Sequence, residues 1–495
     1  MGSTEGSVPV LENYLDGGFR PPHSSALSDV WDPGTGETLV RVPDSDGEDV
    51  DRAVRSAARA LGTWAELPVP QRARFMFALQ RLIQERLNEL AEIVVLENGK
   101  SFEEARGEVQ RGLEVVEFAA AAPTLLMGGG LEQVSAGVDT DMYRYPLGVV
   151  AGITPFNFPA MIPLWMAPLA IVCGNTFVLK PSPRTPGAAA RIVELFAEAG
   201  IPEGVVNLVH GGAGTVRHLL DHPGIRAISF VGSAPVAREI YARAAANGKR
   251  VQALAGAKNH IVVMPDADLD LASRGIFSSA FSNAGQRCLA ASVGVAVGDT
   301  AGPLVDRLAS MAESAMLGHG LERDSVITPL TTREHRDRVE SWIATGVAEG
   351  ARLVVDGRGR KPRGGFFLGP SILDGVRPDM SVAQEEIFGP VLLVERAQDL
   401  DGAIEAVNRS RYGNAAAIFT RSGWAARTFR RRVQAGMVGI NVGVPAPMAF
   451  FPFAGWKGSF YGDLHATGRD AIEFYTERKV VTSRWPAPTR EDAPG

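Results

Sequence analysis

The sequence predicts an α/β protein built on a doubly wound parallel sheet, because short β-branched strands alternate with helices from Leu147 onward. Strands are expected at 149–153, 176–179, 205–209, 227–231 and 251–254, separated by helices at 162–173, 186–199, 213–221 and 234–246. Strand–helix–strand repeats at this spacing are typical of parallel sheets with right-handed crossovers. A second α/β stretch runs from about Asn259 to Val444.

Helices are expected ahead of this sheet, where apolar residues recur at helical spacing. Ser45 and Asp46 can cap the first, and two more run over about 70–97 and 102–127. Alternating runs at 131–135 and 142–145 predict a protruding hairpin, and 479–482 predicts a final strand.

Length and composition bound the class of protein. A chain of 495 residues with 45% hydrophobic and 21% charged residues suggests an ordinary globular protein of two or three domains. The net charge of −6 gives no reason to expect nucleic acid or a membrane as a partner. The start of the chain lacks the pattern of a secretory signal. Two cysteines make no disulfide framework, so we expect a cytoplasmic location, and no ligand motif predicts a metal.

Three strand–helix junctions carry residues suited to a nucleotide, which open α/β sheets bind at the carboxyl ends of their strands. They are 154–159, 180–184 and 230–233. Lys180 can reach ribose hydroxyls, Arg184 a phosphate or an adenine face, and the backbone at Ser233 a phosphate. Each junction alone is more typical of an ordinary loop. The Gly212-Ala213-Gly214 segment lacks the third glycine of the dinucleotide fingerprint.

Cys288 is the candidate nucleophile. It follows Arg287 in a glycine-containing segment, the electropositive setting that favours a thiolate. Cys173 lies in an apolar run and is typical of buried packing. On local chemistry alone, a buried structural cysteine remains the commoner interpretation of Cys288.

The motifs at 154–159, 180–182, 230–233, 285–288 and 385–390 resemble the aldehyde dehydrogenase superfamily in order and spacing. Segments 111–117, 256–260 and 474–476 resemble more narrowly the methylmalonate-semialdehyde dehydrogenase family. The resemblance implies a Rossmann-type cofactor domain (1–127 and 147–256), an α/β catalytic domain (257–455) and oligomerisation elements (128–146 and 456–495). It also implies a homo-oligomer, either a dimer or a tetramer.

The resemblance assigns roles at the site. Cys288 attacks the aldehyde, and the Asn157 amide with the Cys288 backbone N–H forms the oxyanion hole. Glu386 holds the nicotinamide-side ribose and Phe388 packs near the ring. The expected cofactor is NAD, held by Thr154, Phe156, Lys180, Pro183, Arg184, Ser233, Ala255, Glu386 and Phe388.

The expected fate of the acyl group depends on whether the chain carries a glutamate that can act as a base. Hydrolytic relatives carry a glutamate base near 253–255, where this chain has Ala-Leu-Ala, so transfer to coenzyme A is favoured over hydrolysis. Arg287 and Arg111 are implied to bind a substrate carboxylate, although Arg111 alone would be read as a solvated helix arginine. A β-carboxy thioester can lose carbon dioxide, so the expected product is propionyl- or acetyl-coenzyme A.

Three alternatives stay open. Pro183 replaces a glutamate that binds the adenosine ribose in NAD-dependent relatives, so NADP is possible. A second alternative is a hydrolytic NAD(P)-dependent enzyme that acts on another aldehyde. A third is a non-catalytic relative, and the intact Cys288, Asn157 and Glu386 weigh against it.

Overall fold

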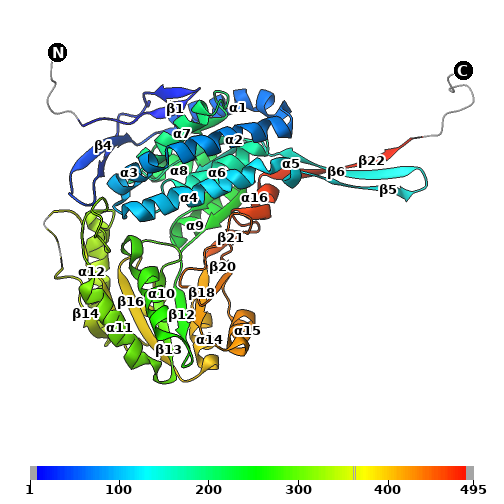
Figure 1. Ribbon diagram of the computed structural model, residues 1–495. Helices are drawn as coiled ribbons and strands as arrows, with labels where there is room; N and C mark the ends of the chain where they lie inside the picture. Colours follow the sequence, from blue (N-terminus) through cyan, green and yellow to red (C-terminus); the bar gives the residue numbers. More distant parts are fainter. Residues whose placement is uncertain (1–7, 361, 363, 486–495) are drawn as a thin grey trace, which may run out of the picture.

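The computed structural model describes residues 8–360, 362 and 364–485, which form two α/β domains and a projecting arm (Figure 1). Residues 1–7, at the start of the segment in which no secretory signal was found, lie outside the described residues, as do residues 486–495 of the expected C-terminal oligomerisation element.

The first domain is built on an eight-stranded sheet in the order β2-β1-β9-β8-β7-β10-β11-β21. Its five central strands are parallel: β7 (Val149–Ile153), β8 (Thr176–Lys180), β9 (Val206–Leu208), β10 (Ile225–Val231) and β11 (Arg250–Leu254). The chain runs from β7 outward to one side and then returns to the other, so the strand order reverses at β7, where such sheets bind ligands. The predicted sheet is therefore confirmed.

Helices cover both faces of this sheet. On one face α1 (Gly47–Glu66), α8 (Ala213–Asp221) and α9 (Ala234–Ala246) share a core with alternate strand residues. On the other, α6 (Met161–Val172) and α7 (Gly187–Glu198) pack with α2 (Val69–Glu85), α3 (Leu87–Asn98) and α4 (Phe102–Ala120).

Two expected helices are each divided. The helix predicted over 70–97 is interrupted at Arg86, whose φ and ψ of −103° and 14° leave the helical range. The one predicted over 102–127 ends at Ala120 and is followed by the short α5 (Ala122–Leu125). Asp46 and Ser101 each form a capping box at the start of α1 and α4, which fixes where these helices begin.

The second domain has a seven-stranded sheet in the order β14-β15-β16-β13-β12-β18-β19, parallel except at β14. Its strands are β12 (Asn259–Val263), β13 (Ala291–Val297), β14 (Arg352–Val355), β15 (Ser371–Asp374), β16 (Val391–Ala397), β18 (Ala415–Phe419) and β19 (Met437–Ile440). Its helices are α10 (Leu269–Phe281), α11 (Ala301–Ser314), α12 (Arg333–Ala348), α13 (Ser381–Gln384), α14 (Leu400–Arg409) and α15 (Gly423–Arg432).

The arm is a three-stranded sheet of β5 (Gly129–Ser135), β6 (Val138–Pro146) and β22 (Thr476–Arg484), which extends away from the body (Figure 1). The tail forms other elements before it reaches the arm. Before β22, β20 (Trp456–Lys457) pairs with β17 (Tyr412–Gly413), β21 (Phe460–Gly462) joins the edge of the first sheet, and α16 (Gly468–Phe474) follows. The tail therefore pairs with strands of both domains before it enters the arm.

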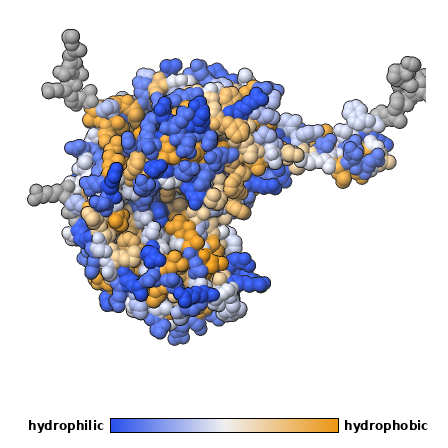
Figure 2. Space-filling model, in the orientation of Figure 1, coloured by the Kyte–Doolittle hydropathy of each residue, from blue (hydrophilic) through white to orange (hydrophobic). Residues whose placement is uncertain are grey.

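Smaller elements complete the first domain. The strands β1 (Asn13–Leu15) and β2 (Gly18–Arg20) extend its sheet, and β3 (Leu27–Trp31) pairs with β4 (Thr38–Pro43). Figure 2 shows hydrophobic residues gathered where the two domains meet, around a hollow in the surface. None of the described helices is long and apolar enough to cross a membrane.

Candidate active site

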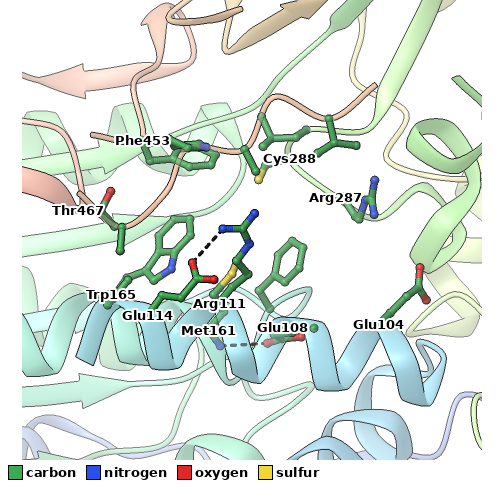
Figure 3. A pocket seen from close by; sticks show the side chains of 18 of the residues that line it. Glu104, Glu108, Arg111, Glu114, Met161, Trp165, Arg287, Cys288, Phe453 and Thr467 are labelled. Carbon is green, nitrogen blue, oxygen red and sulfur yellow. Dashed lines mark hydrogen bonds and ion pairs between the residues drawn. The ribbon is translucent and has the colours of Figure 1, made fainter. Parts of the chain in front are cut away.

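A cavity of about 370 Å³ lies between the two domains, and Cys288 is in its wall. One side is formed by α4, and the other by the loop around Cys288 and by residues 444–453 of the tail (Figure 3). The sulfur of Cys288 points into the cavity, toward the guanidinium of Arg111 on α4.

The loop that leads to Cys288 has an unusual backbone. Asn283, Ala284 and Gly285 all have positive φ angles, of 51°, 49° and 71°. Two of these residues carry a Cβ, so the conformation is strained and must be held by its surroundings. A Cβ at Gly285 would lie 2.1 Å from the Gly389 carbonyl oxygen, so this position requires glycine.

Buried amides on neighbouring strands and loops hold the Cys288 loop. The side chains of Asn259 and Asn414 both donate to the Cys288 carbonyl oxygen at 2.9 Å. The Gln286 side chain accepts from the backbone N–H of Thr331 at 3.1 Å. These contacts fix the position of the sulfur.

Two opposing influences set the pKa of the Cys288 thiol. Burial raises the pKa of Cys288 to about 12, although neighbouring Arg287 and two backbone N–H groups oppose the rise. Desolvation disfavours the thiolate more than one arginine favours it. Arg287 favours the thiolate of Cys288, as its place in the sequence suggests, but burial outweighs this effect in the free protein.

The surroundings of Cys288 on the other side are apolar. Leu254, 5% exposed, packs in a cluster that Cys288 joins, with Leu289, Phe453 and Met437. This is the segment where hydrolytic relatives were expected to carry a glutamate base. The structure thus places hydrocarbon beside the sulfur.

Asn157 follows β7 and lies directly behind the Cys288 loop. It is 4% exposed, and its side-chain amide donates to the Gln286 carbonyl oxygen at 2.9 Å. An amide nitrogen has two N–H groups, and one of them has no hydrogen-bond partner among the described residues. The predicted neighbourhood of Asn157 and Cys288 is thus present.

Arg287 has unused donors beside the site. Its Nε and Nη2 are buried and have no hydrogen-bond partner among the described residues, and its side chain lines the cavity. Burial lowers the pKa of Arg287, but a guanidinium stays charged. A buried cation with free donors favours an anionic ligand.

Arg111 is in a different situation. Its Nη1 donates to Glu114 at 2.9 Å, one turn further along α4, and the side chain is 40% exposed. Both arginines line the one cavity, but only Arg287 offers buried, unpaired donors.

The carboxyl edge of the first sheet has the features of a nucleotide site. The Thr154 hydroxyl, just after β7, is buried without a partner in the part of the chain that the structure describes. Lys180 ends β8, and burial lowers its pKa to about 8 while its Nζ donates to the Gly211 carbonyl at 2.8 Å. Ser233 is exposed at the start of α9. The unpaired Thr154 hydroxyl, the Lys180 ammonium and the exposed Ser233 lie at one sheet edge and fit a dinucleotide.

Glu386 and Phe388 lie across from that edge. Glu386 accepts from the Ala257 backbone N–H at 2.9 Å, and burial raises its pKa to about 7. Phe388 has a φ of 59°, and its ring meets that of Phe156 edge-on at 5.9 Å. The neutral His335 ring, with its pKa lowered to about 4 by burial, contacts the Phe388 carbonyl at 2.7 Å.

Three predicted cofactor residues make other contacts or lack a donor. Arg184 lies over the Phe156 ring and lines another cavity, of about 270 Å³, with Arg333 and Phe366. The Ala255 N–H donates to the Ser459 carbonyl at 2.9 Å. Pro183, in the turn after β8, offers no donor.

Among the charged residues of the cavity that sequence reasoning missed are Lys100, Glu104 and Glu108. The spacing of the two glutamates relative to Arg111 places them on the same helix face, which was the available signal. Charged residues on a helix are usually solvated, so that signal was weak. No group of three or more His, Cys, Asp or Glu side chains positioned to hold a metal occurs within 8–360, 362 and 364–485.

Comparison with known proteins agrees with this site. Residues 19–481 match the aldehyde dehydrogenase family. Malonate-semialdehyde dehydrogenase 1 of Geobacillus kaustophilus is 55% identical over 98% of this chain and 100% of its own length. A putative methylmalonate-semialdehyde dehydrogenase from Sinorhizobium meliloti, solved with NAD, superposes with a TM-score of 0.96 at 44% identity, covering 98% of this chain and 99% of its own. The enzyme from Oceanimonas doudoroffii that bears the same name gives a TM-score of 0.96 at 44% identity, over 97% and 99% of the two chains. The chain belongs to the aldehyde dehydrogenase family.

Proposed function

We propose that this protein oxidises malonate semialdehyde or its methyl homologue with NAD and passes the acyl group to coenzyme A. The observation that carries the proposal is Arg287, which lines the cavity beside Cys288 and has two buried donors, Nε and Nη2, without a partner among the described residues. A short aldehyde with a carboxylate satisfies both residues at once, and relatives at 55% identity carry the corresponding name.

The chain's residues divide the work. Cys288, once deprotonated, attacks the aldehyde carbon to form a thiohemiacetal, whose oxyanion accepts hydrogen bonds from the Asn157 amide and the Cys288 N–H. NAD, held at Thr154, Lys180, Ser233 and Glu386, supplies a hydride acceptor when bound. Loss of hydride leaves a thioester on the Cys288 sulfur.

The acyl group then has a defined route. Its β-carboxylate leaves as carbon dioxide, the resulting enolate takes up a proton, and the thiolate of coenzyme A attacks the acyl carbon and releases Cys288. Water competes poorly, because Leu254 supplies no general base. The products are acetyl-coenzyme A from malonate semialdehyde and propionyl-coenzyme A from the methyl homologue.

A steady-state screen tests this function. Malonate, methylmalonate and succinate semialdehydes and propanal are compared with NAD or NADP, with and without coenzyme A. We expect the two malonate-type substrates to lead, with acyl-coenzyme A and carbon dioxide as products. Free acid formed equally fast without coenzyme A would favour the hydrolytic alternative instead. The ratio of the rate with NAD to the rate with NADP shows whether Pro183 allows NADP to be used.

We also propose a homo-oligomer, a dimer or a tetramer, joined through the arm. Apolar side chains of the arm are exposed, among them Leu131, Tyr143 and Val480. Exposed apolar patches of this kind favour association. Light scattering after gel filtration measures the state, and Val480→Glu should shift it toward the monomer. The cytoplasmic location stays a prediction, as do the domain boundaries.

A further inference from the structure

One face of α4 carries a line of charged residues. Glu104, Glu108, Arg111 and Glu114 are spaced by three or four positions, so they lie on the same side of the helix, and all four line the cavity. Arg111 and Glu114 pair with each other. The two remaining glutamates contact loops that come from elsewhere in the fold.

Glu108 forms a fully buried ion pair with Lys100. The Lys100 Nζ lies 2.5 Å from Glu108 Oε2, and the two side chains are 1% and 0% exposed. The same ammonium lies 4.3 Å from the centre of the Phe158 ring. The pair is therefore sealed against α6 and the segment that precedes it.

This ion pair holds the segment that carries Asn157. Lys100 donates to the Asn157 carbonyl oxygen at 2.7 Å. The other oxygen of Glu108 accepts from the backbone N–H groups of Ala160 and Met161, at 2.8 and 3.1 Å. The segment is thus gripped at Asn157 itself and again three and four residues later (Figure 3 shows the contact to Met161).

Glu104 holds the other loop of the site. Its Oε1 accepts from the Asn283 N–H at 2.8 Å, while its Oε2 accepts from the backbone N–H of Ser101. Asn283 is the first of the three successive residues with positive φ before Cys288. The carboxylate therefore anchors the strained turn at its beginning.

Stability alone does not account for the buried pair. Two ions removed from water lose hydration that their mutual attraction often fails to restore, so apolar residues of similar size serve the core as well. The pair instead positions the backbone, since it binds three backbone groups next to the oxyanion donor: the Asn157 carbonyl and the N–H groups of Ala160 and Met161.

We propose that Glu108 with Lys100, and Glu104, are positioning residues that fasten the Asn157 segment and the Cys288 loop to α4. One rigid helix then sets the distance between the oxyanion donor, the nucleophile and the substrate-binding Arg111. The inference rests on the proposed function in that the reaction uses Asn157 and Cys288 together.

A double-mutant cycle tests the Lys100–Glu108 part. Glu108→Gln should lower kcat by about 10- to 100-fold with the aldehyde KM changed less than about threefold, because the oxyanion donor is displaced while substrate contacts remain. Asn157→Ala should cost at least as much. Combined, the two should cost little more than Asn157→Ala alone, since Glu108 acts through Asn157. Additive losses, or full kcat in Glu108→Gln, overturn the proposal.

Removing one member of a buried pair can prevent folding, so a second variant accompanies the first. Lys100→Met/Glu108→Gln removes both charges together and keeps an acceptor for Ala160 and Met161. It should fold, as judged by thermal unfolding and gel filtration, and show the same loss of kcat. Normal kcat in this folded variant equally overturns the proposal.

Glu97 provides a matched control. It is also a buried glutamate that accepts from two backbone N–H groups at a helix start, those of Gly187 and Ala188 at 2.6 and 3.0 Å. It does not line the cavity. Glu97→Gln should change thermal stability and leave kcat within about twofold, since its contacts hold α7 rather than the site. A kcat loss equal to that of Glu108→Gln would show a merely structural effect.

Glu104 is tested without substrate. Releasing Asn283 should let the strained loop relax, so that Glu104→Ala raises the rate of Cys288 alkylation by iodoacetamide at least about threefold. An unchanged rate overturns the anchoring role. The alkylation assay, and the Glu108/Asn157 double-mutant cycle run with propanal, do not depend on malonate semialdehyde being the substrate. A failure of the positioning role can therefore be told apart from a failure of the proposed function.

Discussion

The two sides of the cavity differ sharply. Around Cys288, Leu289 and Phe453 form an apolar wall, with Leu254 in the same apolar cluster. The helix α4 opposite presents Glu104, Glu108, Arg111 and Glu114. Arg287 is the charged exception on the side of the nucleophile. Holding the substrate and protecting the thioester are therefore separate tasks, although Arg287 and Cys288 are adjacent in the sequence.

The apolar wall determines what happens to the acyl group. It raises the pKa of the Cys288 thiol and offers no base to a water molecule. In the proposed scheme, Arg287 and the charged wall select the aldehyde, and the charged wall aligns the loops. If these roles hold, different residues set substrate selectivity and resistance to hydrolysis, and the two properties can be altered separately.

The largest effect is expected at Arg287. Arg287→Ala should lower kcat/KM for malonate semialdehyde by about 30- to 1,000-fold, because the substrate carboxylate loses its buried partner. For propanal, which has no carboxylate, the loss should stay below about fivefold, apart from any effect on the thiol. Steady-state kinetics on both substrates measure the difference. Equal losses would show that Arg287 supports the loop rather than the carboxylate.

The pH dependence of alkylation tests the apolar wall. The pKa of Cys288 is raised to about 12, so the thiolate fraction grows with pH across the neutral range. In the absence of cofactor, the iodoacetamide rate should rise about tenfold per pH unit from 7 to 9 without levelling off. Mass spectrometry follows the label, and buried Cys173, whose pKa burial also raises to about 12, is the internal control. A plateau below pH 8 would mean that Arg287 outweighs desolvation.

Much of the fold could be predicted from the sequence, because strands buried on both faces give continuous apolar runs of fixed length. β7 and α8 begin and end at the predicted residues. The break at Arg86 was not predictable, since it lies in a sequence with helical periodicity throughout. The tail was also missed: β21 pairs with β11, a contact between segments far apart in sequence that leaves no local signal.

The site was predicted less evenly. The neighbourhood of Asn157 and Cys288 came from a resemblance in motifs, and the structure places them together. The pKa of Cys288 could not be inferred, because it depends on how many atoms surround the sulfur. Glu108 was missed for a similar reason, since its partner Lys100 lies outside the helix that carries it and only folding shows that both are buried.

A smaller change should convert part of the apolar wall into a hydrolytic one. Leu254→Glu places a carboxylate in the cluster that contains Cys288, where burial raises its pKa toward that of a useful base. Release of free acid in the absence of coenzyme A should rise about tenfold, measured with malonate semialdehyde and NAD. Leu254→Gln, of the same size but without a base, should not show the gain. If both variants hydrolyse equally fast, the wild-type thioester is protected by packing and not by the missing base.

The smallest effect is expected on the charged wall, at Glu114. Its carboxylate pairs with Arg111 and faces the same cavity, so it repels a substrate carboxylate that approaches this arginine. Glu114→Gln should therefore lower the KM for malonate semialdehyde about two- to threefold, the scale of a half-exposed ion pair, and leave the KM for propanal unchanged. Arg111→Ala should move the KM for the acidic substrate in the opposite direction. If Glu114→Gln raises that KM as Arg111→Ala does, the glutamate serves to orient the arginine, and the charged wall depends on the pair as a unit.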